Sequence, residues 1–252
     1  EPRVYGERVT TPQPAEPRPD IPWNPPPSAA ERRARGKEMR QRVARRDLGT
    51  LTVEGRDPLG ILDAQNAVRV PELVPLRIER MSASPFAFYR GSAAVMAADL
   101  ARDPSTPIHV ASCGDAHVAN FGFYASPQRT LVFDLNDFDE AAWAPWEWDL
   151  KRLLVSVVLA GAENDRDPAV VHDTVASTVR AYARAIAGLA ERDPIDRYFE
   201  HFGVREAMGS YDRASREVLA QAIADAERRT GARAVRRLTA DGLAVVFISH
   251  KM

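Results

Sequence analysis

The sequence of 252 residues contains a single cysteine and has no apolar run of the roughly 18 residues that a membrane-spanning helix requires. One cysteine excludes an internal disulfide framework and a cysteine-rich zinc site. Lysine and arginine total 34 against 35 acidic residues, so the chain lacks the basic excess of a dedicated nucleic-acid-binding protein. No secretory signal opens the chain. We therefore expect a cytoplasmic protein with neither a membrane nor a nucleic acid as its partner.

What is present is ordinary for a globular protein, since 45% of the residues are hydrophobic and 27% are charged. The proline distribution is uneven. Residues 1–27 hold 9 of the 19 prolines, which predicts an extended or disordered arm. Residues 28–252 are expected to form a single domain, and its oligomeric state cannot be inferred from the sequence.

A basic helix is expected directly after the arm, from Ser28 to about Arg46. Ser28 and Glu31 form the S-x-x-E pattern of a capping box. The arginines and lysine of this segment could contact phosphates, or they could form a solvated charged face.

The expected elements that follow place strands in the middle of the chain and helices after them. Helices are expected over 57–70, 93–101, 148–162, 169–191, 197–208 and 212–229, strands over 73–78, 108–112, 120–124, 130–135 and 243–248, and an aromatic turn over 84–91. The strands over 120–124 and 130–135 are expected to form a hairpin, whose turn is supplied by residues 126–128. This order indicates an α+β fold rather than alternating α/β.

The first polar cluster lies between two expected strands, where residues 113–120 read C-G-D-A-H-V-A-N. An acid, Asp115, an imidazole, His117, and an amide, Asn120, thus lie on one tight connection between buried elements. Loops held by a rigid scaffold are where chemistry usually occurs. The spacing of five between Asp115 and Asn120 lets a carboxylate and an amide oxygen face one site.

A second cluster ends the strand expected over 130–135, where residues 133–140 read F-D-L-N-D-F-D-E. Four acids in seven residues repel one another unless cations or donors compensate their charge. Hard oxygen ligands at a strand end suit Mg²⁺ or Mn²⁺, while an acidic surface turn is the simpler alternative. The two strands are expected to pair and so bring both clusters together.

Asp149 belongs to a third polar segment, where residues 145–153 read P-W-E-W-D-L-K-R-L. It stands at the start of an expected helix. Its carboxylate either caps free N–H groups of that helix or braces the loop of the first cluster.

Together these segments resemble the catalytic core of the aminoglycoside phosphotransferase and choline kinase group, within the protein-kinase-like superfamily. That group has a loop H-G-D-x-H-x-x-N, a strand-end metal motif I-D-[FW]-[ED], and a later D-[LI]-A. More closely, the chain resembles the bacterial family DUF2252 over roughly residues 57–182. The matching stretches are 80–91 (R-M-S-A-S-P-F-A-F-Y-R-G), 113–117, 120–122, 133–140 and 145–153.

The resemblance implies a protein-kinase-like fold, mainly its helical lobe with the catalytic-loop hairpin. It implies a phosphotransferase that depends on ATP and on Mg²⁺ or Mn²⁺, with a small molecule or a protein as the unidentified acceptor. Asp115 would be the catalytic base, His117 would order the loop, and Asp149 would support it. The implied metal ligands are Asn120 and Asp137, with Asp134 and Asp139 as rivals of Asp137.

The chain departs from the kinase pattern upstream of Asp115. The segment 89–92, Y-R-G-S, is not a glycine-rich phosphate loop, and no upstream strand offers a convincing phosphate lysine. We therefore expect the nucleotide-clamp lobe to be incomplete or missing. In the resembled family, a glycine-rich stretch and a Lys-Glu-Ala stretch lie downstream of the helical region, near where this chain ends, which implies a domain truncated at its C-terminus. Arg90 is the candidate phosphate contact, or it forms a salt bridge to a core acid.

Two other functions fit the same residues. In a metal-dependent hydrolase, Asp115, His117, Asp134 and Asp137 would hold two metals that activate water. In a non-catalytic kinase-like module, the proline-rich arm and the basic helix would bind a partner protein.

Overall fold

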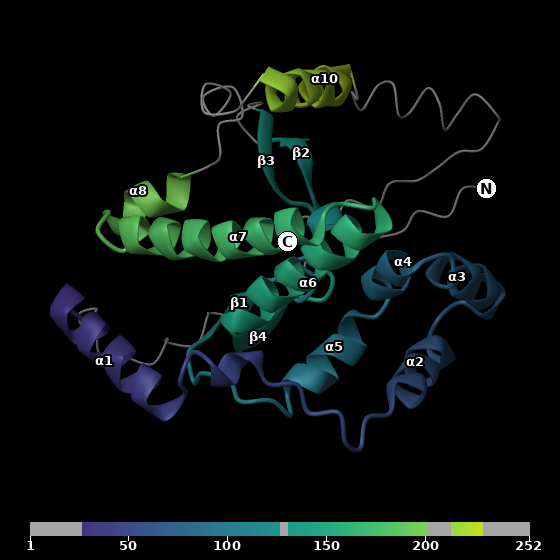
Figure 1. Ribbon diagram of the computed structural model, residues 1–252, viewed down its shortest axis with the longest axis horizontal. Helices are drawn as coiled ribbons and strands as arrows, with labels where there is room; N and C mark the ends of the chain where they lie inside the picture. The colour runs from purple at the N-terminus through teal and green to yellow at the C-terminus, as the bar shows by residue number, and fades with distance from the viewer. Residues whose placement is uncertain (1–26, 127–130, 201–212, 229–252) are drawn as a thin grey trace, which may run out of the picture.

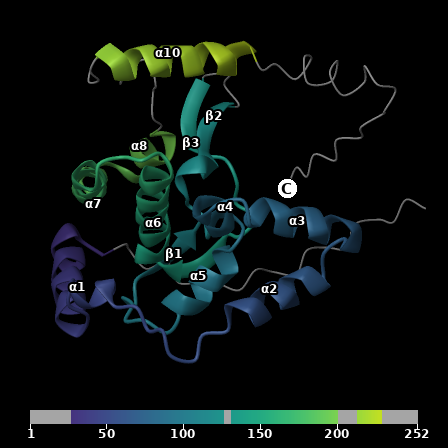
Figure 2. The ribbon, with the colours of Figure 1, turned by 45° about the vertical axis from the view of Figure 1, so that its right-hand side comes forward.

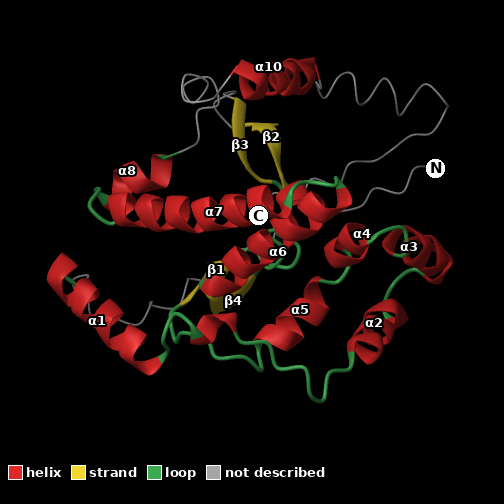
Figure 3. Cartoon of the chain, in the orientation of Figure 1, coloured by secondary structure: helices red, strands yellow, loops and turns green. Residues whose placement is uncertain are grey.

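The computed structural model describes residues 27–126, 131–200 and 213–228, and these residues form an α+β structure of helices with two small antiparallel sheets (Figure 3). The helices are α1 Ala29–Arg42, α2 Pro58–Ala67, α3 Val74–Met81, α4 Pro85–Arg90, α5 Ala93–Leu100, α6 Glu147–Glu163, α7 Pro168–Leu189, α8 Pro194–Phe199 and α10 Arg213–Arg228. The strands are β1 His109–Ser112, β2 Phe121–Ala125, β3 Leu131–Leu135 and β4 Ala142–Pro145. Short 3₁₀ helices lie at Asp47–Gly49, Pro71–Leu73 and Val118–Asn120.

The two sheets flank the polar clusters. Strands β2 and β3 form the expected hairpin, with Phe121 opposite Leu135. Strand β1 pairs with β4, a strand that the sequence did not predict, with Ser112 opposite Ala142. The first cluster connects β1 to β2, and the second cluster leads from the end of β3 towards β4. Each cluster thus links one sheet to the other, so both clusters lie between the two sheets.

Helix α6 lies at the centre of the described structure, with α7 along one side and α4 and α5 on the other (Figures 1 and 2). Helix α10 crosses the outer end of the β2–β3 hairpin (Figure 2). Trp146 stacks on Tyr182 with ring centroids 5.7 Å apart, which joins the start of α6 to α7. Glu147, only 2% exposed, accepts hydrogen bonds from the Thr106 N–H at 2.5 Å and hydroxyl at 2.8 Å. These contacts hold the chain entering β1 against α6.

The capping box at the start of α1 is confirmed. The Ser28 hydroxyl accepts from the Glu31 N–H at 3.2 Å, and the Glu31 carboxylate accepts from the Ser28 N–H at 2.7 Å. The helix ends at Arg42 rather than near Arg46, because Val43 is extended.

Two expectations upstream of the first cluster are wrong. Residues 73–78 do not form a strand but enter helix α3, and residues 84–91 form helix α4 rather than a turn. The reason is the position of proline, which is tolerated in the first turn of a helix, where its missing N–H has no intrahelical partner. Pro75 and Pro85 occupy such positions, and the Ser84 hydroxyl caps α4 by accepting from the Ala87 N–H at 3.1 Å. Both prolines therefore stand at helix starts.

Helix α8 begins and ends earlier than expected, since Asp193 caps it and Pro194 opens it. Four predictions fall wholly or partly outside the described residues. These are residues 1–26 of the expected arm, residues 127 and 128 of the expected hairpin turn, residues 201–208 of the expected helix, and the strand expected over 243–248. No helix in the described ranges has the length and apolar character needed to cross a membrane.

Candidate functional site

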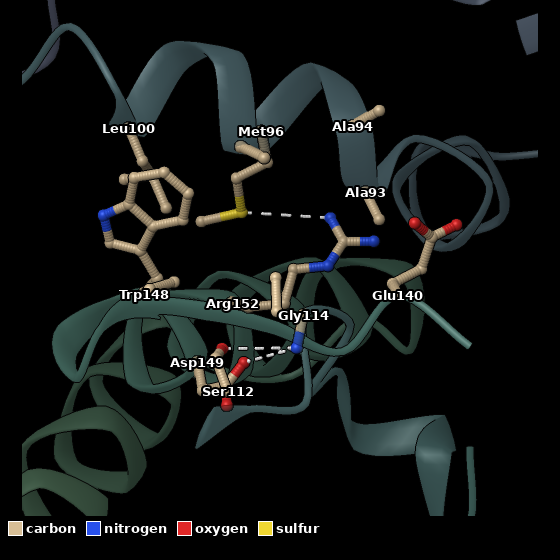
Figure 4. A pocket seen from close by; sticks show the side chains of 13 residues that line it. Ala93, Ala94, Met96, Leu100, Ser112, Gly114, Glu140, Trp148, Asp149 and Arg152 are labelled. Atoms are coloured by element: carbon tan, nitrogen blue, oxygen red, sulfur yellow. Dashed lines mark hydrogen bonds between the residues drawn. The ribbon is translucent and has the colours of Figure 1, made fainter. Parts of the chain in front are cut away.

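The loop after β1 is shaped by Gly114 and by Asp149 of α6. Gly114 has φ +82°, and a Cβ there would lie 2.0 Å from the backbone oxygen of Glu140, so only glycine fits. Asp149 accepts a hydrogen bond from the N–H of Cys113 at 2.7 Å. It accepts another from the N–H of Gly114 at 3.0 Å (Figure 4). Asp149 therefore braces this loop, and α6 has no side-chain cap at its N-terminus.

Asn120 joins the two polar clusters. Its buried amide nitrogen donates to the backbone oxygen of Asp115 at 3.0 Å and to that of Asp137 at 3.1 Å. The backbone at the end of the hairpin adds a third link, since the Asn136 N–H donates to the Asn120 oxygen at 2.9 Å. The sequence expectation that the strands bring both clusters together is therefore confirmed.

The other end of the Asn120 amide has a different environment. None of the described residues donates a hydrogen bond to its Oδ1 atom, and Oδ1 is not among the buried polar atoms that lack a partner. The amide therefore holds the loop through its nitrogen, while its oxygen accepts no hydrogen bond from the described residues. An amide oxygen that is fixed in this way and has no protein donor is a suitable ligand for a hard cation.

Asp115 is held by Arg152, a residue of α6. The Arg152 Nε and Nη2 atoms each lie 2.8 Å from Asp115 Oδ1. The Arg152 side chain is buried, at 3% exposed, whereas that of Asp115 is 21% exposed. A buried guanidinium thus holds a carboxylate that is partly open to solvent. Fork donors of this kind orient a carboxylate as well as neutralising it.

Tyr89 completes the surroundings of Arg152. The guanidinium carbon lies 3.8 Å from the centre of the Tyr89 ring, and Nη2 donates to the Tyr89 backbone oxygen at 2.6 Å. In return the Tyr89 hydroxyl donates to the Arg152 backbone oxygen at 2.9 Å. Burial raises the pKa of Tyr89 to about 12, so the phenol stays protonated and acts as a donor.

His117 lies beside Asp115 without a hydrogen bond to it. Its Nε2 atom is 3.6 Å from Asp115 Oδ2, and the ring meets Phe86 edge-on with centroids 6.4 Å apart. The residue is 6% exposed, and its Nδ1 atom is buried without a partner among the described residues. Burial lowers the pKa of His117, an effect that Asp115 opposes and that Arg152 and Arg90 reinforce. The imidazole is therefore neutral at neutral pH.

The acids of the second cluster are exposed. Asp137 Oδ1 accepts from the Asp139 N–H at 3.0 Å, and Asp134 Oδ1 accepts from the N–H of its neighbour Leu135 at 2.8 Å. The Asp137 backbone is fixed by Asn120, whereas none of the hydrogen bonds of Asp134 or Asp139 reaches the first cluster. Within the described ranges, no three His, Cys, Asp or Glu side chains form a group that could hold a metal ion.

Arg90 ends helix α4 and is exposed. Its charge contributes to the lowering of the pKa of His117. No ion pair of Arg90 exists among the described residues, so the expected alternative of a salt bridge to a core acid is not found there.

Comparison with known proteins identifies the family. Residues 69–244, more than half of the chain, match the family model described as "Uncharacterized protein conserved in bacteria (DUF2252)". The chain belongs to the DUF2252 family. No curated protein and no solved structure matches the chain. The likeness to protein kinases therefore stays a prediction from the motifs of this DUF2252 protein.

The site of this DUF2252 protein also contains two residues, Arg152 and Ser156, to which the motifs assigned no role. Asp149, Arg152 and Ser156 lie on one face of α6, at the spacing of three and then four residues that a helix brings into line. Ser156, fully buried, accepts from the Val118 N–H at 2.9 Å, so all three side chains contact the loop of the first cluster. A polar stripe on an otherwise apolar helix was the signal that could have identified Arg152 and Ser156.

Proposed function

We propose that this protein is a phosphotransferase that uses ATP and Mg²⁺ or Mn²⁺, with Asp115 as the base that receives the proton of the acceptor hydroxyl. The observation that carries the proposal is the position of Asn120. Its amide nitrogen donates to the backbone oxygens of both Asp115 and Asp137, and its amide oxygen accepts no hydrogen bond from the described residues.

Asp115 suits the role of an orienting base. Its Oδ1 atom is fixed by Arg152, while Oδ2 has no hydrogen-bond donor among the described residues and the side chain is 21% exposed. Phosphoryl transfer passes through a loose transition state, in which positioning of the hydroxyl matters more than strong basicity. A carboxylate with one oxygen fixed and the other accessible meets that demand.

The donor set fits a hydrated magnesium ion. Mg²⁺ usually keeps several waters and is bound by one or two protein oxygens together with substrate phosphates. Asn120 Oδ1 and the exposed carboxylate of Asp137 would be those protein ligands, and the ion would neutralise charge on the phosphates. Asp134 and Asp139 are the weaker candidates, because no hydrogen bond joins either side chain to the first cluster.

Arg90, the last residue of α4, would contact the phosphates. It is exposed, it lies close enough to affect the pKa of His117, and its guanidinium has the fork geometry that phosphate oxygens accept. His117 is neutral and buried, so in this account it packs under the loop and does not react.

Thermal unfolding in the presence of Mg²⁺-ATP tests the proposal. A ligand that binds only the folded state at about 100 times its dissociation constant adds about 2.7 kcal/mol to stability. We expect the melting temperature of the wild-type protein to rise with Mg²⁺-ATP, and the rise to be lost in Asp137→Asn. This substitution removes the charge but keeps an oxygen for the Asp139 N–H.

Two further variants make the result specific. Asp134→Asn tests the rival ligand, and Asp63→Asn changes an exposed carboxylate on α2, outside both clusters. Both are expected to keep the rise. If Asp137→Asn keeps it, or if the wild-type protein shows none, the assignment of this site to Mg²⁺-ATP is wrong.

A further inference from the structure

A cavity of about 80 Å³ lies between α5, α6 and the β1–β4 sheet (Figure 4). Its walls are mostly apolar and include Ala93, Ala97 and Leu100 of α5, Ala142 and Ala144 of β4, and Trp148 of α6. One water-sized group needs about 10–15 Å³ of such space, so the cavity has room for about five to eight non-hydrogen atoms. That is the size of a small organic molecule rather than a nucleotide.

One strong donor in this apolar space lacks a strong acceptor. Arg152 uses Nε and Nη2 on Asp115 and Tyr89, but its Nη1 atom has only the thioether sulfur of Met96, at 3.8 Å (Figure 4). A thioether is a weak acceptor, whereas Nη1 carries two N–H groups. Arg152 is 2% exposed, and a buried charged donor without an oxygen partner is costly. The cavity therefore offers a hydrogen bond that the described chain does not satisfy.

The charges around the cavity restrict the kind of ligand. Asp149 and Glu140 line it, and Asp115 lies behind Arg152. Arg152 is the only lysine or arginine among the cavity's lining residues, so carboxylates outnumber cations around this space. An anionic ligand would meet this excess of negative charge, and a cationic ligand would meet Arg152, which only donates. A neutral oxygen acceptor fits both constraints.

We propose that this cavity is a binding site for a small neutral molecule with an apolar body and one oxygen, such as an alcohol, that accepts a hydrogen bond from Arg152 Nη1. The apolar body lies against the alanines and Leu100, and the oxygen takes the place that Met96 sulfur fills poorly. The proposal goes beyond phosphoryl transfer and stands on the cavity alone, because binding there requires neither ATP nor a metal ion.

Methyl NMR with cyclopentanol as the probe tests this site. The protein is labelled with ¹³C at the methionine methyl groups, and the resonance of Met96 is assigned with a Met96→Leu variant. Cyclopentanol falls in the expected size range, and cyclopentane is the matched ligand without the hydroxyl. We expect a saturable shift of the Met96 resonance with cyclopentanol, and at least about tenfold weaker binding of cyclopentane.

A pair of variants on α5 locates the binding. Ala97→Leu fills the cavity, and Ala98→Leu adds the same side chain at the next position, which is not a cavity wall. Cyclopentanol is expected to shift the Met96 resonance in Ala98→Leu but not in Ala97→Leu. The absence of a saturable shift in the wild-type protein, or equal affinity for the two ligands, overturns the proposal even if Ala97→Leu fails to fold. A failed ATP titration leaves this result untouched.

Discussion

The Arg152 guanidinium and the Asp115 carboxylate meet through two nitrogens, Nε and Nη2, each 2.8 Å from the same oxygen, Oδ1. Arg152 also binds the backbone oxygen of Tyr89 and lies over its ring. A single buried side chain thus sets the direction of the proposed base.

Arg152→Met should destabilise the protein, because Asp115 would lose its ion pair and the hydrogen bond from Nε while most of its side chain remains covered. Leaving one partner of a buried pair uncompensated costs about 3–5 kcal/mol, and the 21% exposure of Asp115 reduces our expectation to about 2–3 kcal/mol. Urea unfolding measures this difference. Lys151→Met, on the neighbouring and less buried position, is the control and should change stability by less than about 1 kcal/mol. Equal stability of Arg152→Met and the wild-type protein would contradict this role.

Gly114→Ala should be poorly tolerated. Its φ of +82° is unfavourable for alanine, and the new Cβ would overlap the backbone oxygen of Glu140. A backbone oxygen cannot rotate away from this overlap as the end of a flexible side chain could. We expect a loss of at least about 2 kcal/mol in the free energy of unfolding. Gly188→Ala is the matched change, since its Cβ meets nothing within 4 Å and it lies in helix α7, where alanine is favoured by up to about 1 kcal/mol. We expect the unfolding free energy to decrease in Gly114→Ala and to increase in Gly188→Ala. An unchanged unfolding free energy in Gly114→Ala would contradict the close approach of Gly114 to the Glu140 backbone.

Asp149→Ala removes the acceptor of two backbone N–H groups, those of Cys113 and Gly114. The Gly114 N–H also donates to the Ser112 hydroxyl at 3.3 Å, so the Cys113 N–H is the donor that is left unsatisfied. Because an unsatisfied buried donor costs about 1–3 kcal/mol, we expect a loss of about that size and faster hydrogen exchange at the Cys113 amide. Asp173→Ala, an exposed carboxylate of α7, should leave both properties unchanged. Unaltered exchange at Cys113 in Asp149→Ala would show that the brace is not needed.

The stability of the protein should fall as the pH drops below about 6.5 because of His117. Burial lowers the pKa of His117 below its ordinary value of 6.5, so near pH 6 the unfolded chain binds a proton that the folded chain does not. The unfolding free energy then decreases with falling pH, by at most about 1.4 kcal/mol per pH unit for this group. His117→Gln should reduce that slope, whereas His172→Gln, an exposed histidine, should not. Urea titrations at several pH values between 5 and 8 measure both, and identical slopes for the wild type and His117→Gln would refute the assignment.

Local signals predicted much of the structure. The capping box of Ser28, the hairpin of β2 and β3, and the long helices α6 and α7 all follow from spacing and pattern within one segment. Helices α3 and α4 were missed because a proline signals both a break and a helix start, and only the surrounding packing decides between them. Strand β4 was missed because four residues carry too little pattern, and its partner β1 lies 30 residues earlier.

In the candidate site, too, the residues in local motifs were predicted and those defined by distant contacts were not. Asp115, His117, Asn120, Asp137 and Asp149 were selected from motifs, and the structure brings these five residues around one loop. Arg152 was not assigned a role, because its partners Tyr89 and Asp115 are 63 and 37 residues away and no local pattern links them. Contacts of this kind appear only when the helices are assembled.

Turnover of Mg²⁺-ATP, followed by ³¹P NMR, tests the central claim most directly. We predict slow conversion of ATP to ADP by the wild-type protein, with water or an added alcohol as the acceptor, and at least about a hundredfold slower conversion by Asp115→Asn, which keeps the shape of the side chain but loses the base. Binding of Mg²⁺-ATP, measured by the melting temperature, should persist in that variant. Conversion at the same rate by Asp115→Asn, or no conversion by a wild-type protein that binds Mg²⁺-ATP, would contradict the account.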